Sequence, residues 1–491
     1  MEIVLALDAG TSNVRCVAFD AALNVLDEAH RELTSSFPAP GEVEQDPHEI
    51  VALAVATLTE VARRQRAVGH EPVAVGLTNQ RETTVGFDRE TGETFQPAIV
   101  WQDRRTSAYC RDLAKCGHEP EVRAVTGLVL DSYFSATKIH WMLERGLGER
   151  GRAPSFATVD TWLLWRLTGG TDGGVFLTEP SNASRTLLMD LATRTWSPAM
   201  TTLFGVDLAT LAEIRPSTGP FGVVSAAVVP ELAGVPLAGV LGDQQSALFG
   251  QAAFAPGTAK ATYGTGAFVL ANAGESVPTV IDGLLSTVAW DLGTRGPSAY
   301  ALEGSAFVAG AAVQWLRDLG LVGTSSELEA LALTVPDCAG VQFAPAFTGL
   351  GSPFWRPHAR GAITGLTRGV TRAHVARALV EALAFQVRAM TDALAHGGLT
   401  LRELRADGGA SAMDLLLQLQ ATNSRVDVVR SATLEATARG AASVAGLSVG
   451  VWSSLDDLSE LWRTERRFVP EDPGVVDEGY RSWRRCVERL G

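Results

Sequence analysis

The chain has 491 residues, of which 46% are apolar, and carries a net charge of −14. This length exceeds that of one ordinary hydrophobic core, so two large domains are expected. The acidic balance argues against nucleic acid or an anionic membrane surface as a partner, because both need clustered Lys and Arg.

The sequence gives no sign of a targeting or anchoring segment. The opening MEIVLALD lacks a basic region and a cleavage site, so we expect no signal peptide. No apolar run is long enough to span a bilayer, and we expect no membrane anchor. Five scattered cysteines without a CxxC pair are typical of reduced thiols, and these features together predict a cytoplasmic protein.

The N-terminal half opens as strand, tight turn and strand. Apolar residues run through 3–7 and 14–19, with DAGTSN between them. Helical periodicity follows over residues 49–65, and VAVGLTNQ at 73–80 is typical of a strand that leads into a polar loop. The predicted order of elements is therefore β-β-α-β.

A comparable order begins again after the middle of the chain. TAKATYGTGAFVLAN repeats the strand, Gly/Thr turn and strand. Helical patterns then follow over residues 307–320, 371–395 and 412–422. We therefore predict two domains of similar plan, 1–250 and 251–491, joined near residues 248–257.

The two Gly/Thr turns suggest phosphate chemistry. DAGTSN and YGTGAF contain small residues whose backbone N–H groups can approach phosphate oxygens, and their hydroxyls add donors. Ordinary hairpins use the same residues, so that alternative stays open. The chain has no GxxxxGK[ST] and no GxGxxG after a strand, which excludes a P-loop NTPase and leaves a Rossmann dinucleotide site without support.

Asp8 ends the first apolar run, directly before the first turn. A carboxylate there suits Mg²⁺, although turn-capping Asp residues are common. Three polar clusters, NQRETT at 79–84, DSYFSATKIHW at 131–141 and GDQQSALFG at 242–250, supply the donors, acceptors and aromatic rings that grip a small polyhydroxylated molecule. Taken alone, each cluster is more often a solvated loop or a structural ion pair.

Nine motifs taken together resemble the glycerol kinase branch of the FGGY carbohydrate kinase family, in both sequence and order. They cover nearly the whole chain: DAGTSNVRCVAFD, NQRETTV, AIVWQDRRT, DSYFSATKIHWML, TEPSNASRTLLMD, GDQQSALFGQ, TYGTGAF, EGSAFVAGAAVQWLRD and DGGASA. The resemblance implies an α/β protein with two actin-like ATPase (ribonuclease H-like) domains. In such a fold, helices flank mixed sheets and the active-site cleft lies between the domains.

The resemblance also implies roles for individual residues. Asp243 is expected to be the general base toward the acceptor hydroxyl, and Asp8 the Mg²⁺ ligand. The residues expected to bind glycerol are Arg81, Glu82, Trp101, Tyr133, Asp243, Gln244 and Phe268. The residues expected to bind ATP are Thr11, Ser12, Asn13, Arg15, Thr265, Gly266, Gly310, Gln314, Gly409 and Ala410.

The implied reaction is in-line transfer of a phosphoryl group from ATP to glycerol, giving sn-glycerol 3-phosphate with the help of Mg²⁺. A kinase for another small polyol or a ketose remains an alternative within the family. An ATP-dependent conformational clamp is a third reading, because the same fold hosts such proteins. A clamp would not need the constellations around Arg81 and Asp243. The resemblance is compatible with a homodimer or a homotetramer.

The chain departs from the family pattern after DGGASA, where Met413 stands in place of the usual Asn. Loss of the amide would relax the preference for the nucleotide base, or Met413 would pack against the adenine ring. The segment ahead of GDQQ also lacks the arginine-containing loop with which some family members bind fructose 1,6-bisphosphate. We therefore expect no control by that compound.

Overall fold

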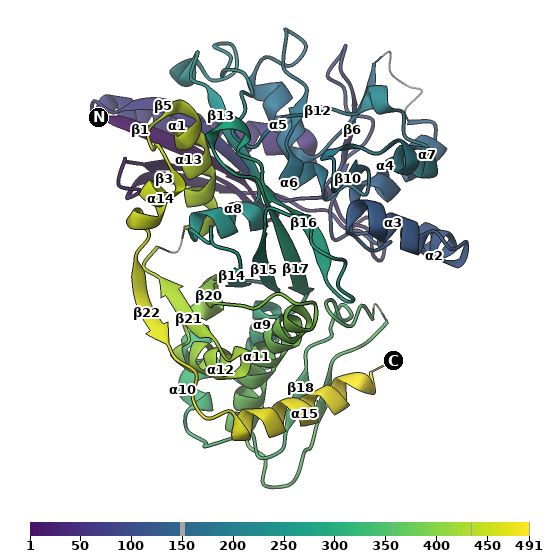
Figure 1. The fold of residues 1–491 in the computed structure, drawn as a ribbon, viewed down its shortest axis with the longest axis vertical. Coiled ribbons are helices and arrows are strands. Elements are labelled where there is room, and N and C mark those ends of the chain that lie inside the picture. Colours follow the sequence, from purple (N-terminus) through teal and green to yellow (C-terminus); the bar gives the residue numbers. More distant parts are fainter. Residues whose placement is uncertain (148–152, 357, 434, 491) are drawn as a thin grey trace.

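Two β-sheets, one in each half of the chain, organise the molecule. The computed structural model describes residues 1–147, 153–356, 358–433 and 435–490. Figure 1 shows the first half, coloured purple to teal, above the second half, coloured teal-green to yellow. The mixed α/β architecture predicted from the sequence is confirmed.

The first sheet has the strand order β3-β2-β1-β5-β13. β1, β2 and β3 are antiparallel neighbours, whereas β5 runs parallel to both β1 and β13. Their bounds are β1 Glu2–Ala9, β2 Asn13–Phe19, β3 Val25–Glu32, β5 Glu71–Asn79 and β13 Leu237–Gly242. The connecting helix α1, Pro47–Ala67, packs against this sheet. The expected strands and helix are confirmed, while β3 was missed because most of its residues are polar or exposed.

The second sheet has the order β16-β17-β15-β14-β20-β21-β22. β14, β15 and β17 are antiparallel neighbours, and β20 runs parallel to both β14 and β21. These five strands therefore repeat the order and directions of the first sheet, as the sequence predicted. The bounds are β14 Thr258–Tyr263, β15 Ala267–Gly274, β16 Leu285–Trp290, β17 Ala299–Ala306, β20 Glu403–Asp407, β21 Asp427–Ser431 and β22 Thr464–Phe468.

The expected helices of the second half are present with slightly different ends. They are α9 Gly310–Asp318, α11 Arg372–His396 and α12 Asp414–Ser424. The other helices are α2 Ser107–Lys115, α3 Glu119–Thr126, α4 Ser135–Glu144, α5 Val159–Leu167, α6 Pro180–Ala183, α7 Pro198–Phe204, α10 Ser325–Ala332, α14 Leu455–Leu461 and α15 Gly474–Glu488. The remaining short strands are β4 Glu44–Gln45, β6 Val85–Asp88, β7 Ala98–Ile99, β8 Pro154–Ala157, β9 Leu177–Thr178, β10 Met189–Asp190, β11 Thr195–Trp196, β12 Glu213–Ile214, β18 Gln342–Ala344 and β19 Ala362–Thr364.

The halves meet along two helices, α8 (Asp243–Gly250) and α13 (Ala436–Val449). α13 comes from the second half, yet it packs on β1, β5 and β13 of the first sheet as well as on α8; it lies beside that sheet in Figure 1. A Cβ atom at Gly440 would lie 1.8 Å from the Ser246 carbonyl oxygen, and one at Gly250 would lie 1.9 Å from that of Ala436. The two helices therefore touch backbone to backbone.

Two other expectations concern the thiols and the membrane. All five cysteines are free thiols, and four of them are buried, which confirms the thiol prediction. Within the described ranges, no helix combines the length and apolar character needed to cross a membrane.

The helix contact yields a stability test. Gly440→Ala is expected to lower the free energy of unfolding by about 1–3 kcal/mol, because the new methyl group overlaps backbone atoms that cannot rotate away. Gly474→Ala is the control, since its Cβ atom would meet only Asp472 Oδ1, at 3.6 Å. The control is expected to stay within about 0.5 kcal/mol of the unaltered protein. Urea unfolding measures both, and equal stabilities would contradict the tight contact.

Candidate active site

The loop that follows β5 carries Arg81 and Glu82, both 2% exposed. Glu82 has a φ of 62°, in the left-handed region that is uncommon for residues other than glycine. Its carbonyl oxygen accepts hydrogen bonds from Ser135 Oγ at 3.0 Å, Thr84 Oγ1 at 3.0 Å and Lys138 Nζ at 3.3 Å. Three donors on one carbonyl hold a strained backbone in place, which is typical of functional sites.

Four buried charged side chains form one network that joins the two halves. Arg81 donates to both carboxylate oxygens of Glu303, at 2.6 and 3.1 Å. Arg185 donates to Glu82 at 2.7 Å and to Glu303 at 2.9 Å. Burial alone would raise the pKa of Glu303, but the charges of Arg185 and Arg81 outweigh it and lower that pKa to about 2. Glu303, on β17, therefore stays ionised and fixes the guanidinium of Arg81.

Asp243 is the accessible carboxylate beside this network. It is the first residue of α8, its Oδ1 lies 3.2 Å from Arg81 Nε, and its side chain is 29% exposed against 2% for that of Arg81. The Trp101 and Tyr133 rings pack edge to face at 5.6 Å. Burial raises the pKa of the Tyr133 phenol, which keeps it a neutral hydrogen-bond donor. The Asp243 carboxylate thus contacts the Arg81 guanidinium, and Tyr133 is an electrostatic neighbour of Arg81.

Asp8, near the end of β1, pairs with Arg15 at 2.9 Å, and Arg15 also pairs with Glu435. Burial raises the pKa of Asp8, Arg15 opposes that shift, and the negative charges of Asp243 and Glu435 add to it. Asp8 and Asp243 are therefore electrostatic neighbours whose repulsion a cation would relieve.

This donor set fits Mg²⁺ that is shared with a substrate. In the described part of the chain, no group of three or more His, Cys, Asp or Glu side chains could hold a metal ion alone. Mg²⁺ commonly takes one or two carboxylates and completes its shell with phosphate oxygens and water. The carboxylate of Asp8 suits that arrangement.

The first predicted phosphate turn joins β1 to β2. Thr11 Oγ1 accepts a hydrogen bond from Trp101 Nε1 at 2.9 Å, and its carbonyl oxygen accepts one from Gln45 Nε2 at 2.7 Å. The next two residues, Ser12 and Asn13, are exposed. The turn is thus anchored at Thr11 and open beyond it, and the Trp101 contact ties it to the predicted acceptor residues.

The second predicted turn joins β14 to β15 and is hydrogen-bonded to the start of α9. The Gly310 amide donates to the Gly264 carbonyl at 2.9 Å, and the Ala309 amide donates to that of Thr265 at 2.8 Å. A Cβ atom at Gly310 would lie 2.6 Å from the Gly264 oxygen, and one at Gly266 would lie 2.5 Å from a neighbouring carbonyl oxygen. These glycines permit the close approach, and in this structure the Gly310 amide supports the turn.

The predicted nucleotide residues Gly409 and Ala410 lie near the second turn. The preceding residue, Gly408, has a φ of 85°, and its Cβ atom would lie 2.7 Å from the Tyr263 carbonyl. Gly409 faces open space, with nothing within 4 Å of a Cβ position. Met413 is 5% exposed and belongs to the core of the second half.

Three further predicted residues lie on α9, β15 and α8. Gln314 is exposed on α9, bonds Asp318 and Arg317 of its own helix, and lines a separate depression of about 660 Å³. Phe268 is half-buried on β15. Gln244 accepts a hydrogen bond from Lys260. Gln244 thus lies beside Asp243 at the start of α8, whereas Gln314 lies on a separate surface.

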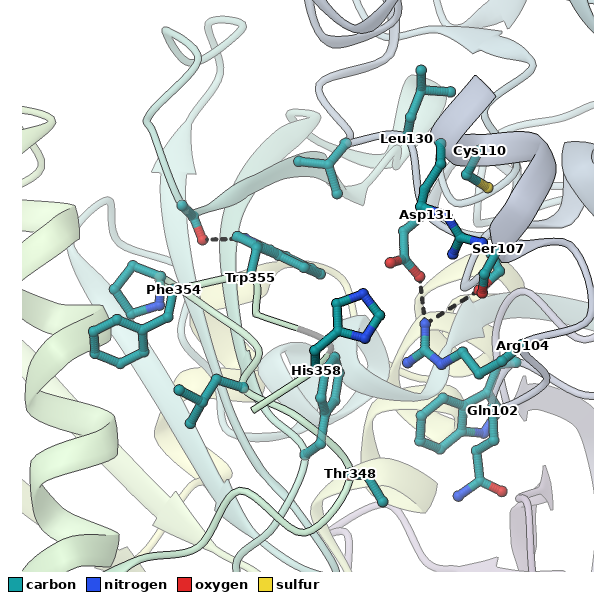
Figure 2. Close-up of a pocket in the computed structure, with 18 of the residues that line it drawn as sticks. Gln102, Arg104, Ser107, Cys110, Leu130, Asp131, Thr348, Phe354, Trp355 and His358 are labelled. Carbon is teal, nitrogen blue, oxygen red and sulfur yellow. Dashed lines mark hydrogen bonds and ion pairs between the residues drawn. The ribbon is translucent and has the colours of Figure 1, made fainter. Parts of the chain in front are cut away.

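A cavity of about 1050 Å³ lies between the halves, and its lining includes Trp101 and Thr265. Figure 2 shows Arg104, which bonds Asp131 at 2.6 Å, across the cavity from His358. Among the described lining residues, Trp101 and Thr265 are the members of the predicted site. The cavity therefore adjoins the acceptor residues and one phosphate turn, and has the size typical of small-molecule sites.

Sequence reasoning missed Arg185, Glu303 and Lys138. Each stood in a motif that was recognised, SNASRT, EGSAFV and YFSATK respectively, but was given no role. All three are charged and 0% exposed. Glu303, in AYALEGSAFV, is a charged residue inside a mostly apolar segment, which indicates a buried and paired charge. Arg185 and Lys138 stand among polar residues, and the sequence around them carries no such signal.

Two sheets that share a five-strand plan, with a cavity between the two halves, define a two-domain protein of the actin-like class. Residues 3–250 match the model for the N-terminal domain of the FGGY family of carbohydrate kinases, and residues 259–449 match that for its C-terminal domain. The chain belongs to the FGGY family of carbohydrate kinases.

Relatives of known name align over the full length. A glycerol kinase from Thermus brockianus is 51% identical, with 100% of this chain and 98% of that protein covered. One from Polaromonas naphthalenivorans is 48% identical, with 100% and 99% covered. The crystal structure of Plasmodium falciparum glycerol kinase with ADP matches with a TM-score of 0.93 and 34% identity, covering 100% and 98%. A gluconate kinase from Lactobacillus acidophilus shares the fold at 18% identity and a TM-score of 0.89, covering 99% and 98%.

The buried network predicts a pH-dependent stability. Glu303→Gln leaves two arginines without their shared partner and is expected to cost about 3–5 kcal/mol at neutral pH. Because the pKa of Glu303 is lowered from 4.5 to about 2, its contribution is complete above pH 4.5 and is lost as pH falls toward 2. Urea unfolding at several pH values measures the gap between the two proteins, which should narrow over that window.

The control is Glu213→Gln, which removes an exposed carboxylate paired with Arg215. Exposed pairs contribute about 0–1 kcal/mol, so this variant should match the unaltered protein at every pH. A constant gap for Glu303→Gln across the acid range would contradict the lowered pKa.

Proposed function

We propose that the chain transfers a phosphoryl group from ATP to glycerol, giving sn-glycerol 3-phosphate. The observation that carries this proposal is the group of Asp243, Arg81 and Glu82, held by a buried ion network in a chain that aligns end to end with glycerol kinases. Carboxylates and a guanidinium offer the acceptors and donors that a triol requires.

The acceptor would lie between the polar network and the aromatic rings. Arg81 and Glu82 bind its hydroxyl groups, with Tyr133 as an added donor, while Trp101 and Phe268 pack against its carbon atoms. The fixed geometry of the network supports this reading, because a preorganised site spends little binding energy on ordering side chains.

Asp243 would act on the terminal hydroxyl. The hydroxyl oxygen attacks the γ-phosphorus, the bond from that phosphorus to the bridging oxygen of ADP breaks, and the proton passes to the Asp243 carboxylate. Phosphoryl transfer has a loose transition state in which positioning and charge neutralisation contribute most of the rate. Asp243 therefore serves mainly to orient the hydroxyl and to accept its proton late.

The triphosphate would lie between the two hairpin turns. Thr11, Ser12, Asn13 and Arg15 serve one side, and Thr265 with Gly266 the other. Bound Mg²⁺, held in part by Asp8, would neutralise negative charge on the phosphates. We assign the nucleoside to the second domain, through Gly310, Gln314, Gly409 and Ala410, with domain boundaries at 1–250 and 251–491.

We also propose a cellular location and an oligomeric state for the enzyme. The free thiols support a reducing cytoplasm. A homodimer or a homotetramer is the expected assembly, which light scattering on purified protein measures.

The choice of acceptor separates the alternatives. Coupled ADP release against a panel of polyols and ketoses should give the highest kcat/KM for glycerol. 1,2-Propanediol should fall well below it, because a missing hydroxyl leaves buried polar groups unpaired and such sites discriminate by about 10⁴-fold. Comparable values for the two compounds would contradict the acceptor site. ADP release without any acceptor would favour a conformational clamp.

The base assignment has its own test. Asp243→Asn should keep measurable glycerol binding by calorimetry while kcat falls by about 10²–10⁴-fold, the usual contribution of a general base. Asp112→Asn, which alters an exposed carboxylate paired with Lys115, is the matched control. Turnover of Asp243→Asn near that of the control would refute the assignment.

A further inference from the structure

Lys260 is a buried cation for which the reaction described above has no role. It lies on β14 in the second half and is 0% exposed. Its ammonium group donates to Thr262 Oγ1 at 2.7 Å and to Gln244 Oε1. Gln244 follows Asp243 directly on α8, so a lysine of one half binds the helix that carries the proposed base of the other.

Charged groups approach Lys260 from four elements. Asp407 lies on β20, Asp243 on α8, Glu303 on β17, and Arg81 in the loop after β5. Burial lowers the pKa of Lys260, and Asp407 and Asp243 oppose that shift. Among the described residues, its ammonium group donates hydrogen bonds to an amide oxygen and a hydroxyl oxygen and to no carboxylate.

A buried ammonium without a direct carboxylate partner is costly to maintain. Carboxylates lie near Lys260, but none accepts a hydrogen bond from it, so a negatively charged substrate would offset this cost further. The second phosphate turn begins three residues after Lys260 in the chain, and Asp243 is its electrostatic neighbour. The positive charge of Lys260 is thus close to Asp243 and to the second turn, between which acceptor and phosphate would meet.

The bond to Gln244 also sets the orientation of its amide. An amide side chain has one acceptor oxygen and one donor NH₂ group, and the oxygen is occupied by Lys260. The NH₂ group must then point away from Lys260, where it can donate to a hydroxyl or phosphoryl oxygen. Without Lys260 the amide could rotate, and its NH₂ group would no longer be held in that direction.

We propose that Lys260 is a positioning residue for phosphoryl transfer, which orients the Gln244 amide and supplies positive charge behind Asp243. The proposal rests on the function proposed above. It assigns no proton transfer to Lys260, whose charge must persist through the reaction. Arginine, which keeps its charge and its donors, should therefore substitute in part, whereas methionine, of similar length but uncharged, should not.

The test compares Lys260→Met and Lys260→Arg with the unaltered protein, using the acceptor of highest kcat/KM from the polyol panel. Lys260→Met should lose about 100-fold in kcat, as when one fixed donor is removed from a charge-stabilising site. KM for the acceptor should change much less than kcat. Lys260→Arg should recover at least part of the loss. Lys115→Met, at an exposed position, is the control and should have no effect.

The pH profile adds a readout that a merely structural role would not move. The lowered pKa of Lys260 places the loss of its charge below the usual value of about 10.4 for lysine, so kcat of the unaltered protein should fall in the alkaline range. Guanidinium stays charged, and Lys260→Arg should shift that fall to higher pH. This comparison of pH profiles tests the role of the Lys260 charge even if Lys260→Met does not fold.

An unshifted alkaline limb in Lys260→Arg, or turnover of Lys260→Met within a few fold of the control, would overturn the proposal. Both results require an active unaltered protein, so they leave the proposed function standing. A glycerol-inactive protein that phosphorylates another polyol would overturn only the choice of acceptor, and Lys260 would then be judged with that polyol.

Discussion

The double ion pair of Glu303 with Arg81 and Arg185 is the interaction on which the acceptor site depends. Glu303 comes from the second sheet, while both arginines come from the first half of the chain. Breaking a buried ion pair by removing one partner is strongly destabilising, because the remaining charge has no compensation. The first half therefore cannot order its own acceptor residues alone, and the site is a product of both halves.

The repeated sheet plan explains why these groups meet. In each half the first hairpin places a short turn at the same edge of the sheet, and the next parallel strand ends beside it. Asp8 lies near the end of β1, Asp243 directly follows β13, and Gly408 directly follows β20. A duplicated framework thus gives each half a Gly/Thr turn at the corresponding place, and in the first half it makes Asp8 and Asp243 electrostatic neighbours.

Much of this architecture was predictable, because apolar periodicity and the order of nine motifs both constrain it. β3 was not predicted, because its alternation of apolar and polar residues is weak. The role of Glu303 was not predicted either, because nothing in the local sequence indicates that this strand residue pairs with two arginines more than a hundred residues away. Gly310 stays a prediction for the nucleotide site, and the bond from its amide to the neighbouring turn could not be predicted from the sequence. Local patterns specify elements and turns, whereas cross-chain partners of buried charges need the fold.

Backbone contact between α8 and α13 has a consequence for how the molecule can move. Where side chains separate two helices, the helices can slide as the side chains change rotamers. At Gly250 and Gly440 no side chains separate the helices. Any rotation of one half against the other must therefore have its hinge at this contact. Asp243 is the first residue of α8, the helix that ends at this hinge. Its carboxylate would therefore move little during such a rotation, while the parts of the two halves far from the hinge would move most.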